Sequence, residues 1–255
     1  MSFDVSGDAY GRFMGRFSEP LAARFVELID AHEGQSALDV GCGPGALTRE
    51  LVDRLGVPSV AAIDPSESFV ETVRERFPGI DVRRGVAEEL PYPDHRFDLV
   101  LAQLVVHFMS DPIAAVAEMA RVARANGTVA ACVWDHGGDR GPLTTFWQAV
   151  RDLDPDASDE SSLPGTHEGD LSRLFEQAGF AEVEPATLTI RVGFSSFDDW
   201  WEPFTLGVGP AGEYVAHLDT TRRDDLKARC AELLPTGPFA LDASAWTAIG
   251  RVQES

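Results

Sequence analysis

The sequence predicts an α/β fold built on a mostly parallel sheet of seven strands, with helices on both faces of that sheet. Short apolar segments of strand length alternate along the chain with longer segments whose apolar residues recur every three or four positions. Several of the short segments are apolar throughout, as expected of parallel strands that are buried on both faces. A strand, a helix and a further strand at this spacing form a βαβ unit, so we expect a doubly wound sheet.

The first half of the chain accounts for five of these strands. A helix is expected over 20–33, and the following helix carries leucines at every fourth position and stops at Gly56. Asp111-Pro112 supplies the N-cap and first turn of a later helix that Asn126-Gly127 would end. The predicted strands lie at 37–40, 60–63, 80–83, 97–102 and 128–134, and the helices between them at 47–55, 66–77 and 111–124.

The second half of the chain is less regular. Residues 154–169 are acidic and rich in serine and proline, which predicts a loop. Helices are expected over 142–153 and 170–178, and strands over 183–192 and 239–252. The segment between these two strands is longer than a hairpin and partly helical. We therefore expect an N-terminal lid or helical segment over 1–34, a main domain over 35–196 with 236–255, and a helical insertion over 197–235 that covers one face.

Composition limits the kinds of partner. The 255 residues include 21 Lys and Arg against 42 Asp and Glu, a formal net charge of −21. So negative a surface repels phosphate backbones and anionic lipid headgroups, and we expect no nucleic acid and no membrane partner. Cys42, Cys132 and Cys230 are widely spaced, and the histidines lack metal-ligand spacing, so neither disulfides nor a metal are expected. No secretion signal and no apolar run of ~20 residues is present, which predicts a cytoplasmic protein, either monomer or homodimer.

A glycine-rich segment carries the chemistry. Asp39-Val40-Gly41-Cys42-Gly43-Pro44-Gly45 joins the first predicted strand to the next helix. Glycines allow a sharp turn and a close approach of the backbone to a ligand, and the helix start offers unpaired N–H groups. Asp64 ends the second strand, where a carboxylate can accept hydrogen bonds from both hydroxyls of a ribose. These features predict an adenosine-type cofactor at the carboxyl ends of the strands.

The spacing distinguishes between two classes of cofactor. Dinucleotide sites usually have the pattern G-x-G-x-x-G, whereas this loop has G-x-G-x-G after an acidic residue. Asp39 lies where it can hold an ammonium group, directly or through water, and it would repel a pyrophosphate. S-adenosylmethionine carries such an ammonium group, so the sequence favours this methyl donor over a dinucleotide. The alternative is that Asp39 only caps the loop, and that Asp64 only caps a helix.

Three segments resemble a known family. Residues 37–48, ALDVGCGPGALT, resemble the first motif of class I S-adenosylmethionine-dependent methyltransferases, and residues 62–66, AIDPS, resemble the second. Residues 87–93, AEELPYP, with 97–100, FDLV, are similar to the third-strand loop and fourth strand of the ubiquinone/menaquinone-biosynthesis-like branch, methyltransferase type 11. The resemblance covers 35–135 and implies a Rossmann-like fold.

The resemblance also implies a cofactor-binding set. Family members often have an acidic residue where this chain has Val86, so the adenine amino group would depend on backbone carbonyls or on Glu88, which is otherwise a solvated side chain. The implied roles are the methionine end for Asp39, Gly41, Gly43 and Gly45, the ribose for Asp64, the adenine faces for Pro65 or Ser66, its amino edge for Ala87 and Glu88, and the cofactor's underside for Gln103.

The acceptor side is less defined. His107 follows the fourth strand and is a candidate general base for an O–H or N–H acceptor, or else a structural histidine. Trp134 follows the fifth strand on the same rim. Of Trp200 and Trp201, we expect one in the core and the other in an apolar acceptor pocket. The segment that holds Tyr10, Phe13 and Arg16 suits a lid over the site, and the alternative is packing on the sheet edge.

The expected function is transfer of a methyl group from S-adenosylmethionine to an unidentified small-molecule acceptor, giving S-adenosylhomocysteine. The donor is already activated, so the protein mainly supplies positioning and desolvation. A base is needed only where the acceptor must lose a proton. The alternatives are a non-catalytic cofactor-binding module and a nicotinamide-dependent oxidoreductase.

Overall fold

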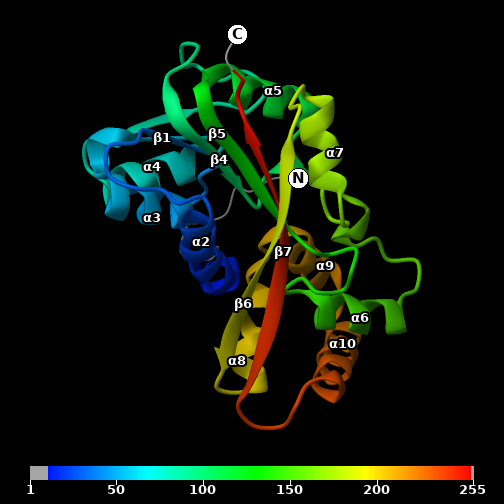
Figure 1. Cartoon of the computed structure of the whole chain (residues 1–255). Coiled ribbons are helices and arrows are strands. Elements are labelled where there is room, and N and C mark those ends of the chain that lie inside the picture. Colours follow the sequence, from blue (N-terminus) through cyan, green and yellow to red (C-terminus); the bar gives the residue numbers. More distant parts are fainter. Residues whose placement is uncertain (1–10, 254–255) are drawn as a thin grey trace.

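A computed structural model describes residues 11–253 and contains the expected seven-stranded sheet (Figure 1). The strand order is β3-β2-β1-β4-β5-β7-β6. The first five strands are parallel, and β7 runs antiparallel to both β5 and β6. The prediction of a mostly parallel sheet is therefore confirmed. The strands are β1 (Ala37–Val40), β2 (Val60–Asp64), β3 (Asp81–Arg84), β4 (Phe97–Gln103), β5 (Ala123–Trp134), β6 (Val183–Phe194) and β7 (Phe239–Arg251).

Helices cover both faces of the sheet. Consecutive residues of β1 face opposite cores: Ala37 packs with α2 and α3, whereas Leu38 packs with α5 and α7. All four residues of β1 are buried, which explains the lack of polar alternation. The helices of the main domain are α2 (Arg16–Leu28), α3 (Ala46–Leu55), α4 (Glu67–Arg76), α5 (Pro112–Val122) and α7 (Asp170–Gln177), with short turns η1 (Gly11–Gly15), η2 (Val57–Ser59), η3 (Val106–Phe108) and η4 (Glu160–Ser162).

Helices α2 and α5 differ from their predicted bounds, and α2 ends at Leu28 where Glu33 was expected. Helix α2 begins at Arg16 and not at Pro20, because Phe17 and Leu21 lie one turn apart on the face that is buried against the sheet. Helix α5 begins as expected, with the Asp111 carboxylate accepting the backbone N–H of Ala114 at 3.0 Å. It ends at Val122, and the chain passes directly into β5, so Asn126-Gly127 lies within the strand and does not end the helix.

A helical cap adjoins the long β6–β7 pair. It consists of α6 (Thr144–Leu153), α8 (Phe197–Trp201), η5 (Glu202–Leu206), α9 (Gly209–His217) and α10 (Thr220–Leu233). Figure 1 shows β6 and β7 running past the other strands to reach α8 and α10. Phe146 of α6 stacks on Phe204 of η5, with ring centroids 4.5 Å apart, and Arg229 of α10 pairs with Asp152 of α6 at 2.7 Å. Residues 197–235 are largely helical, and α6 joins them in one cap.

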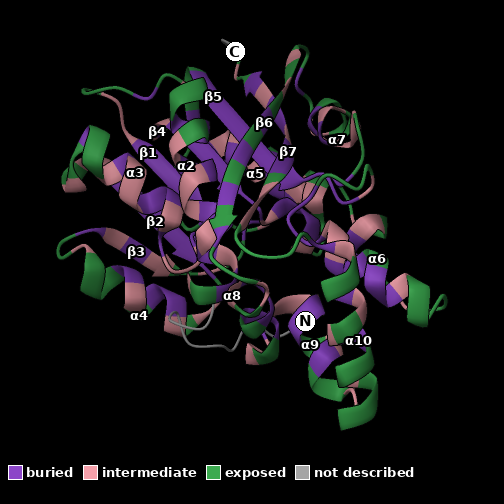
Figure 2. Cartoon of the chain, turned by 90° about the horizontal axis from the view of Figure 1, so that it is seen from below, coloured by how far each residue is buried: buried purple, intermediate pink, exposed green. Residues whose placement is uncertain are grey.

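The buried core runs through both parts of the molecule. Seen from below, the central strands are buried along most of their length, whereas the outer sides of α10 and α4 are exposed (Figure 2). Phe13 of η1 contacts Phe204 of the cap edge-on, with centroids 5.2 Å apart. The start of the described chain therefore packs against the cap, above the carboxyl ends of the strands.

Candidate functional site

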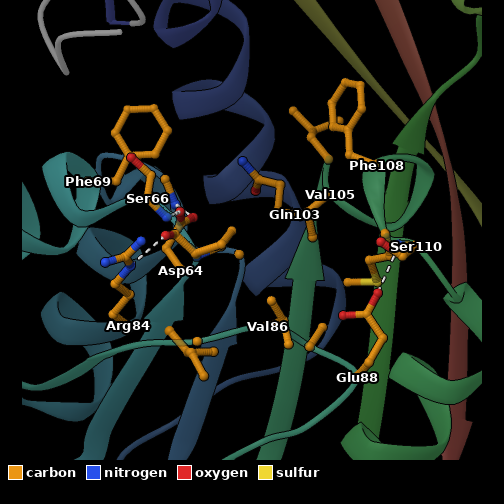
Figure 3. Close-up of a pocket in the computed structure, with 18 of the residues that line it drawn as sticks. Asp64, Ser66, Phe69, Arg84, Val86, Glu88, Gln103, Val105, Phe108 and Ser110 are labelled. Carbon is orange, nitrogen blue, oxygen red and sulfur yellow. Dashed lines mark hydrogen bonds between the residues drawn. The ribbon is translucent and has the colours of Figure 1, made fainter. Parts of the chain in front are cut away.

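A cavity of about 740 Å³ opens at the carboxyl ends of β1, β2 and β4. Asp64, Ser66, Phe69 and Arg84 lie on one side of it, and Val105, Phe108, Ser110 and Glu88 on the other (Figure 3). Parallel sheets bind ligands at this edge, where the strand order reverses direction. The lining residues are Gly41, Gly43, Ile63, Asp64, Pro65, Ser66, Glu67, Phe69, Arg84, Gly85, Val86, Ala87, Glu88, Gln103, Leu104, Val105, His107, Phe108, Met109 and Ser110.

The glycine-rich loop turns tightly beside this cavity. Gly41 has a φ of 70°, and a Cβ at this position would collide with the side chain of Val105. Gly43 has a φ of 52°, and a Cβ there would meet nothing within 4 Å. The sequence therefore needs glycine at 41 because the neighbouring chain is close. At 43 the loop borders open space that a ligand can approach.

Asp64 ties the second strand to this loop. Its Oδ2 accepts the backbone N–H of Gly43 and its Oδ1 accepts that of Ser66, both at 2.8 Å. Burial raises the pKa of Asp64 above its ordinary value, and the two hydrogen bonds oppose that shift. The N-cap residue of α4 is Ser66, so Asp64 is not the N-cap that the alternative interpretation expected. Its carboxylate lines the cavity where a ribose would approach the end of β2.

Asp39 lies behind the loop and does not line the cavity. Its side chain is buried, and its Oδ2 accepts a hydrogen bond from Thr48 Oγ1 at 2.6 Å. Its Oδ1 has no hydrogen-bond partner within residues 11–253. Burial raises the pKa of Asp39 to about 7. Of the two arrangements that the sequence allowed, contact with an ammonium group through water fits this position better than direct contact.

The far side of the cavity contains the residues expected around an adenine. Val86 is 47% exposed, which is unusual for valine and leaves an apolar face open to the cavity. Ala87 is buried beside it. The Glu88 carboxylate accepts the backbone N–H groups of Ser110 and Asp111 at 2.8 and 3.2 Å, so it holds the segment before α5 and is not a freely solvated side chain.

Gln103 connects the cavity to the N-terminal helix. It is the last residue of β4, and its Nε2 donates to the backbone carbonyl of Ser18 in α2 at 2.9 Å. Its Oε1 is buried and has no partner in the part of the chain that the structure describes. Gln103 therefore lines the cavity and keeps a buried hydrogen-bond acceptor that no described residue uses.

A second, smaller chamber of about 40 Å³ adjoins the main cavity. Leu104, His107 and Phe108 line both spaces, so the two are neighbours. The chamber lies between the main sheet, η1 and the start of α9. Its lining residues are Phe13, Met14, Leu104, His107, Phe108, Trp134, His136, Leu143, Glu160, Val208, Gly209, Pro210 and Ala211.

Two buried histidines face this chamber. The rings of His107 and His136 lie 6.3 Å apart, and both are more than nine-tenths buried. Neither Nδ1 of His107 nor Nε2 of His136 has a hydrogen-bond partner among the described residues. Burial lowers the pKa of His107 to about 3 and that of His136 to about 4. Both are therefore neutral at pH 7 and can hydrogen-bond an acceptor, but His107 is a weak base for the role that the sequence suggested.

The other residues that were predicted to line the acceptor pocket differ in whether they reach the chamber. Phe13 and Trp134 line the chamber. Trp200 and Trp201 are both buried and pack near Phe204, and neither lines the main cavity or the chamber. They form the wall behind the lining, where the sequence analysis expected one of them to reach the pocket.

Arg16 is engaged with the cap. It pairs with the Asp199 carboxylate at 2.8 Å and donates to the Asp199 carbonyl at 2.9 Å. It therefore ties α2 to α8 and lines neither space. Tyr10 lies outside the described residues.

Glu160 is a chamber residue that the sequence analysis missed. It begins η4, is 5% exposed, and accepts a hydrogen bond from Trp147 Nε1 at 2.9 Å. Burial raises its pKa to about 7. The segment 154–169 is acidic throughout, and no local pattern separates Glu160 from its exposed neighbours. Only its packing against α6 makes it different.

Within residues 11–253, no group of three or more His, Cys, Asp or Glu side chains is arranged to hold a metal ion. None of the helices over the same residues has the length and apolar character needed to cross a membrane.

Comparison with known proteins indicates a family. A methyltransferase domain model matches residues 38–131, which hold the glycine-rich loop, Asp64 and Gln103. Over this segment the chain is similar to class I S-adenosylmethionine-dependent methyltransferases. The ubiquinone/menaquinone-like branch stays a prediction.

Two relatives that match the chain are named methyltransferases, and a solved structure shares its fold. An uncharacterized methyltransferase of Mycobacterium tuberculosis is 34% identical over 166 residues, which are 64% of this chain and 65% of the relative. Nocamycin O-methyltransferase of Saccharothrix syringae is 31% identical over 51% of this chain and 48% of its own. The chain thus spans about two thirds or less of these relatives. A putative methyltransferase structure from Bacillus halodurans has a TM-score of 0.59 at 18% identity, covering 91% of this chain and 99% of its own.

Proposed function

We propose that this chain transfers the methyl group of S-adenosylmethionine to a small-molecule acceptor and releases S-adenosylhomocysteine. The observation that carries the proposal is the meeting of Asp64 and the glycine-rich loop at one edge of the cavity. This arrangement offers a carboxylate for a ribose and a close backbone approach beside it. Similarity to the methyltransferase family supports the same activity.

The cavity residues fit this cofactor chemically. The unused Oε1 of Gln103 and the exposed face of Val86 suit a polar group and an apolar ring. Asp39 adds negative charge behind the loop once it is ionised, which suits the ammonium and sulfonium groups of the donor. Among the described lining residues, Arg84 is the only Arg or Lys, and it donates a hydrogen bond to the backbone carbonyl of Pro65. Arg76 donates to the carbonyl of Pro44 in the glycine-rich loop, so the preference for the methyl donor over a dinucleotide depends on the loop spacing and on Asp39.

The chain's own contribution to the reaction is positioning and exclusion of water. When bound, S-adenosylmethionine supplies a methyl group that is already activated. The adjoining chamber, with mostly apolar walls formed by residues such as Phe13, Leu143 and Val208, would hold the reacting group of the acceptor out of water beside the cavity. His107 borders both spaces and is neutral, so it can orient an acceptor by a hydrogen bond.

The acceptor atom is the next question. The name of the Saccharothrix relative includes O-methyltransferase, so oxygen is the first atom to test.

We also propose a cytoplasmic location, because all three cysteines are free and buried. Monomer and homodimer are both retained as assembly states.

Binding measurements test the cofactor assignment. Isothermal titration of the purified chain with S-adenosylhomocysteine and with NADH should give micromolar affinity for the first and no binding for the second. NADH binding without S-adenosylhomocysteine binding would move the protein to the oxidoreductases. A cofactor-binding module would bind S-adenosylhomocysteine yet release none from S-adenosylmethionine with any oxygen, nitrogen, carbon or sulfur acceptor.

A further inference from the structure

We propose that the chamber binds the hydroxyl group of an uncharged phenol or enol acceptor, and that Glu160 accepts the proton of that hydroxyl during methyl transfer. The inference rests on the proposed function, because it assigns the acceptor site of the same reaction. It names a catalytic residue that lies in neither the glycine-rich loop nor the strand ends.

Unused polar atoms point to a ligand in the chamber. Buried polar groups normally find hydrogen-bond partners, and those that lack one need an explanation. Here Nδ1 of His107, Nε2 of His136 and Nε1 of Trp134 are all buried, and none has a partner within residues 11–253. All three residues line the same small space. A hydroxyl group both donates and accepts hydrogen bonds, so it can satisfy an indole N–H, a neutral imidazole and a carboxylate together.

The size of the chamber brings these groups together. A volume of about 40 Å³ is room for about three water molecules. A hydroxyl within it is therefore confined among the lining side chains. The ring or chain that carries the hydroxyl would extend past Leu104 and Phe108, which also line the main cavity. This places the hydroxyl in the chamber and its carbon skeleton along the shared wall.

Glu160 is suited to accept a proton. Trp147 Nε1 holds one carboxylate oxygen at 2.9 Å, which fixes the side chain. Burial raises its pKa to about 7, so a proton can be taken up and released near neutral pH. The neighbouring Asp159 carboxylate is paired with Arg151 at 2.8 Å. Glu160 itself has no ion pair among the described residues.

The charge of the chamber selects an uncharged acceptor. No Lys or Arg of the described chain lines it, and Arg16, the nearest candidate from the sequence, is paired with Asp199. A carboxylate acceptor would therefore lack a counter-ion and would lie near Glu160. An ammonium acceptor would lose its hydration against walls that are mostly apolar, and among the described lining residues only Glu160 carries a carboxylate. A neutral hydroxyl avoids both penalties.

In the proposed reaction the methyl group passes directly from the donor sulfur to the acceptor oxygen. The hydroxyl oxygen of the acceptor forms a bond to the methyl carbon. The bond between that carbon and the donor sulfur breaks, and its electron pair stays on sulfur, which becomes a neutral thioether. The hydroxyl proton moves to the Glu160 carboxylate. His107 and His136 remain neutral, and one N–H of the chamber holds the oxygen through one lone pair while the other lone pair forms the bond to the methyl carbon.

Binding of small probes to the protein loaded with S-adenosylhomocysteine tests the acceptor class. Phenol, benzoate and benzylamine have similar size and differ in charge, and ligand-detected NMR can compare them. We expect phenol to bind at least tenfold more tightly than the two charged probes. Equal or tighter binding of benzoate or benzylamine, or no phenol binding, would overturn the inference. Failure of S-adenosylhomocysteine itself to bind is a separate result that refutes the proposed function first.

A coloured phenol tests the role of Glu160 through charge. The ionisation of bound 4-nitrophenol, followed by absorbance, should shift to higher pH than that of the free dye, because ionised Glu160 disfavours a phenolate beside it. Glu160→Gln removes the charge but keeps the shape, and we expect the shift to fall by about one pH unit. The matched control Glu168→Gln changes an exposed glutamate of the same loop and should retain the full shift.

A folding control and a second variant distinguish loss of the Glu160 charge from misfolding. Thermal melting checks that Glu160→Gln is folded. Trp147→Phe keeps a ring in place but removes the N–H that stabilises the carboxylate, so it should also reduce the shift. A dye shift equal to that of the wild type in both variants would exclude Glu160 from the acceptor site.

Discussion

Replacement of Asp64 by alanine should weaken the binding of S-adenosylhomocysteine by a factor of about a hundred to ten thousand. Asp64 ends β2, and its carboxylate lines the cavity while each of its oxygens accepts one backbone N–H from residues 11–253. Each oxygen therefore keeps a lone pair for a ribose hydroxyl. Hydrogen bonds to a charged group are worth about 1.5–3 kcal/mol each, so the loss of two costs about 3–6 kcal/mol, which gives this range.

The assay must separate this loss from damage to the loop. The same carboxylate holds the backbone of Gly43 and Ser66, so Asp64→Ala also loosens the glycine-rich loop. Asp64→Asn retains an acceptor oxygen for one of these N–H groups, and we expect an intermediate affinity. Titration at about pH 8 favours the ionised wild-type carboxylate, because burial raises its pKa above the ordinary value. Asp53→Ala, on the exposed side of α3, serves as the matched control.

The result that would refute this reasoning is specific. If folded Asp64→Ala bound S-adenosylhomocysteine within threefold of the wild type, the ribose assignment would be wrong. A loss of equal size in Asp53→Ala would show that the assay reports general damage. A loss confined to Asp64→Ala and smaller in Asp64→Asn supports a direct contact.

Three further predictions concern the loop, its acidic support and the cap. Gly41→Ala should lower the free energy of unfolding in urea by about 2–5 kcal/mol, because φ is positive and the new Cβ meets Val105, and an unchanged midpoint would contradict this. Burial raises the pKa of Asp39 to about 7, so its contribution to wild-type stability falls as pH rises from about 4 to about 7, by at most about 1.4 kcal/mol per pH unit. Asp39→Asn should therefore gain stability relative to the wild type across that window, and a constant difference in urea denaturation would refute the shift. Arg16→Ala should cost about 1 kcal/mol of unfolding free energy, because both partners in its ion pair with Asp199 are about one-third exposed, and titration should find its S-adenosylhomocysteine affinity unchanged.

The strands and most helices could be predicted because their signals are local. The closing strand was expected over 239–252 and spans Phe239–Arg251, and the helix expected over 47–55 spans Ala46–Leu55. Apolar runs and leucine spacing depend only on neighbouring residues. The start of α2 was wrong because Phe17 is buried by the sheet, which its local sequence does not reveal. The end of α5 was wrong because the strand pairing of β5 begins at Ala123, before the turn residues.

The positions and partners of individual charged side chains were harder to predict. Arg16 was expected over the acceptor site, and it pairs instead with Asp199, which lies 183 positions further along the chain. Glu160 was hidden in an acidic loop, and its burial depends on Trp147 of another element. These side chains take their positions from contacts between segments that are far apart in the sequence. A single sequence gives no direct information on which distant segments meet.

The two halves of the site differ in how they are encoded. The cofactor half comes from consecutive strand-to-helix turns, so Gly41, Asp64 and Gln103 reach the same edge because of the parallel sheet alone. The acceptor half is assembled from η1, η3, the loop after β5, η4 and the start of α9, which are far apart in the sequence. Changes in η4 or α9 can therefore alter the chamber while the glycine-rich loop keeps its geometry. On this argument, similarity to the family predicts the methyl donor well, whereas the acceptor must be inferred from chamber residues such as Glu160.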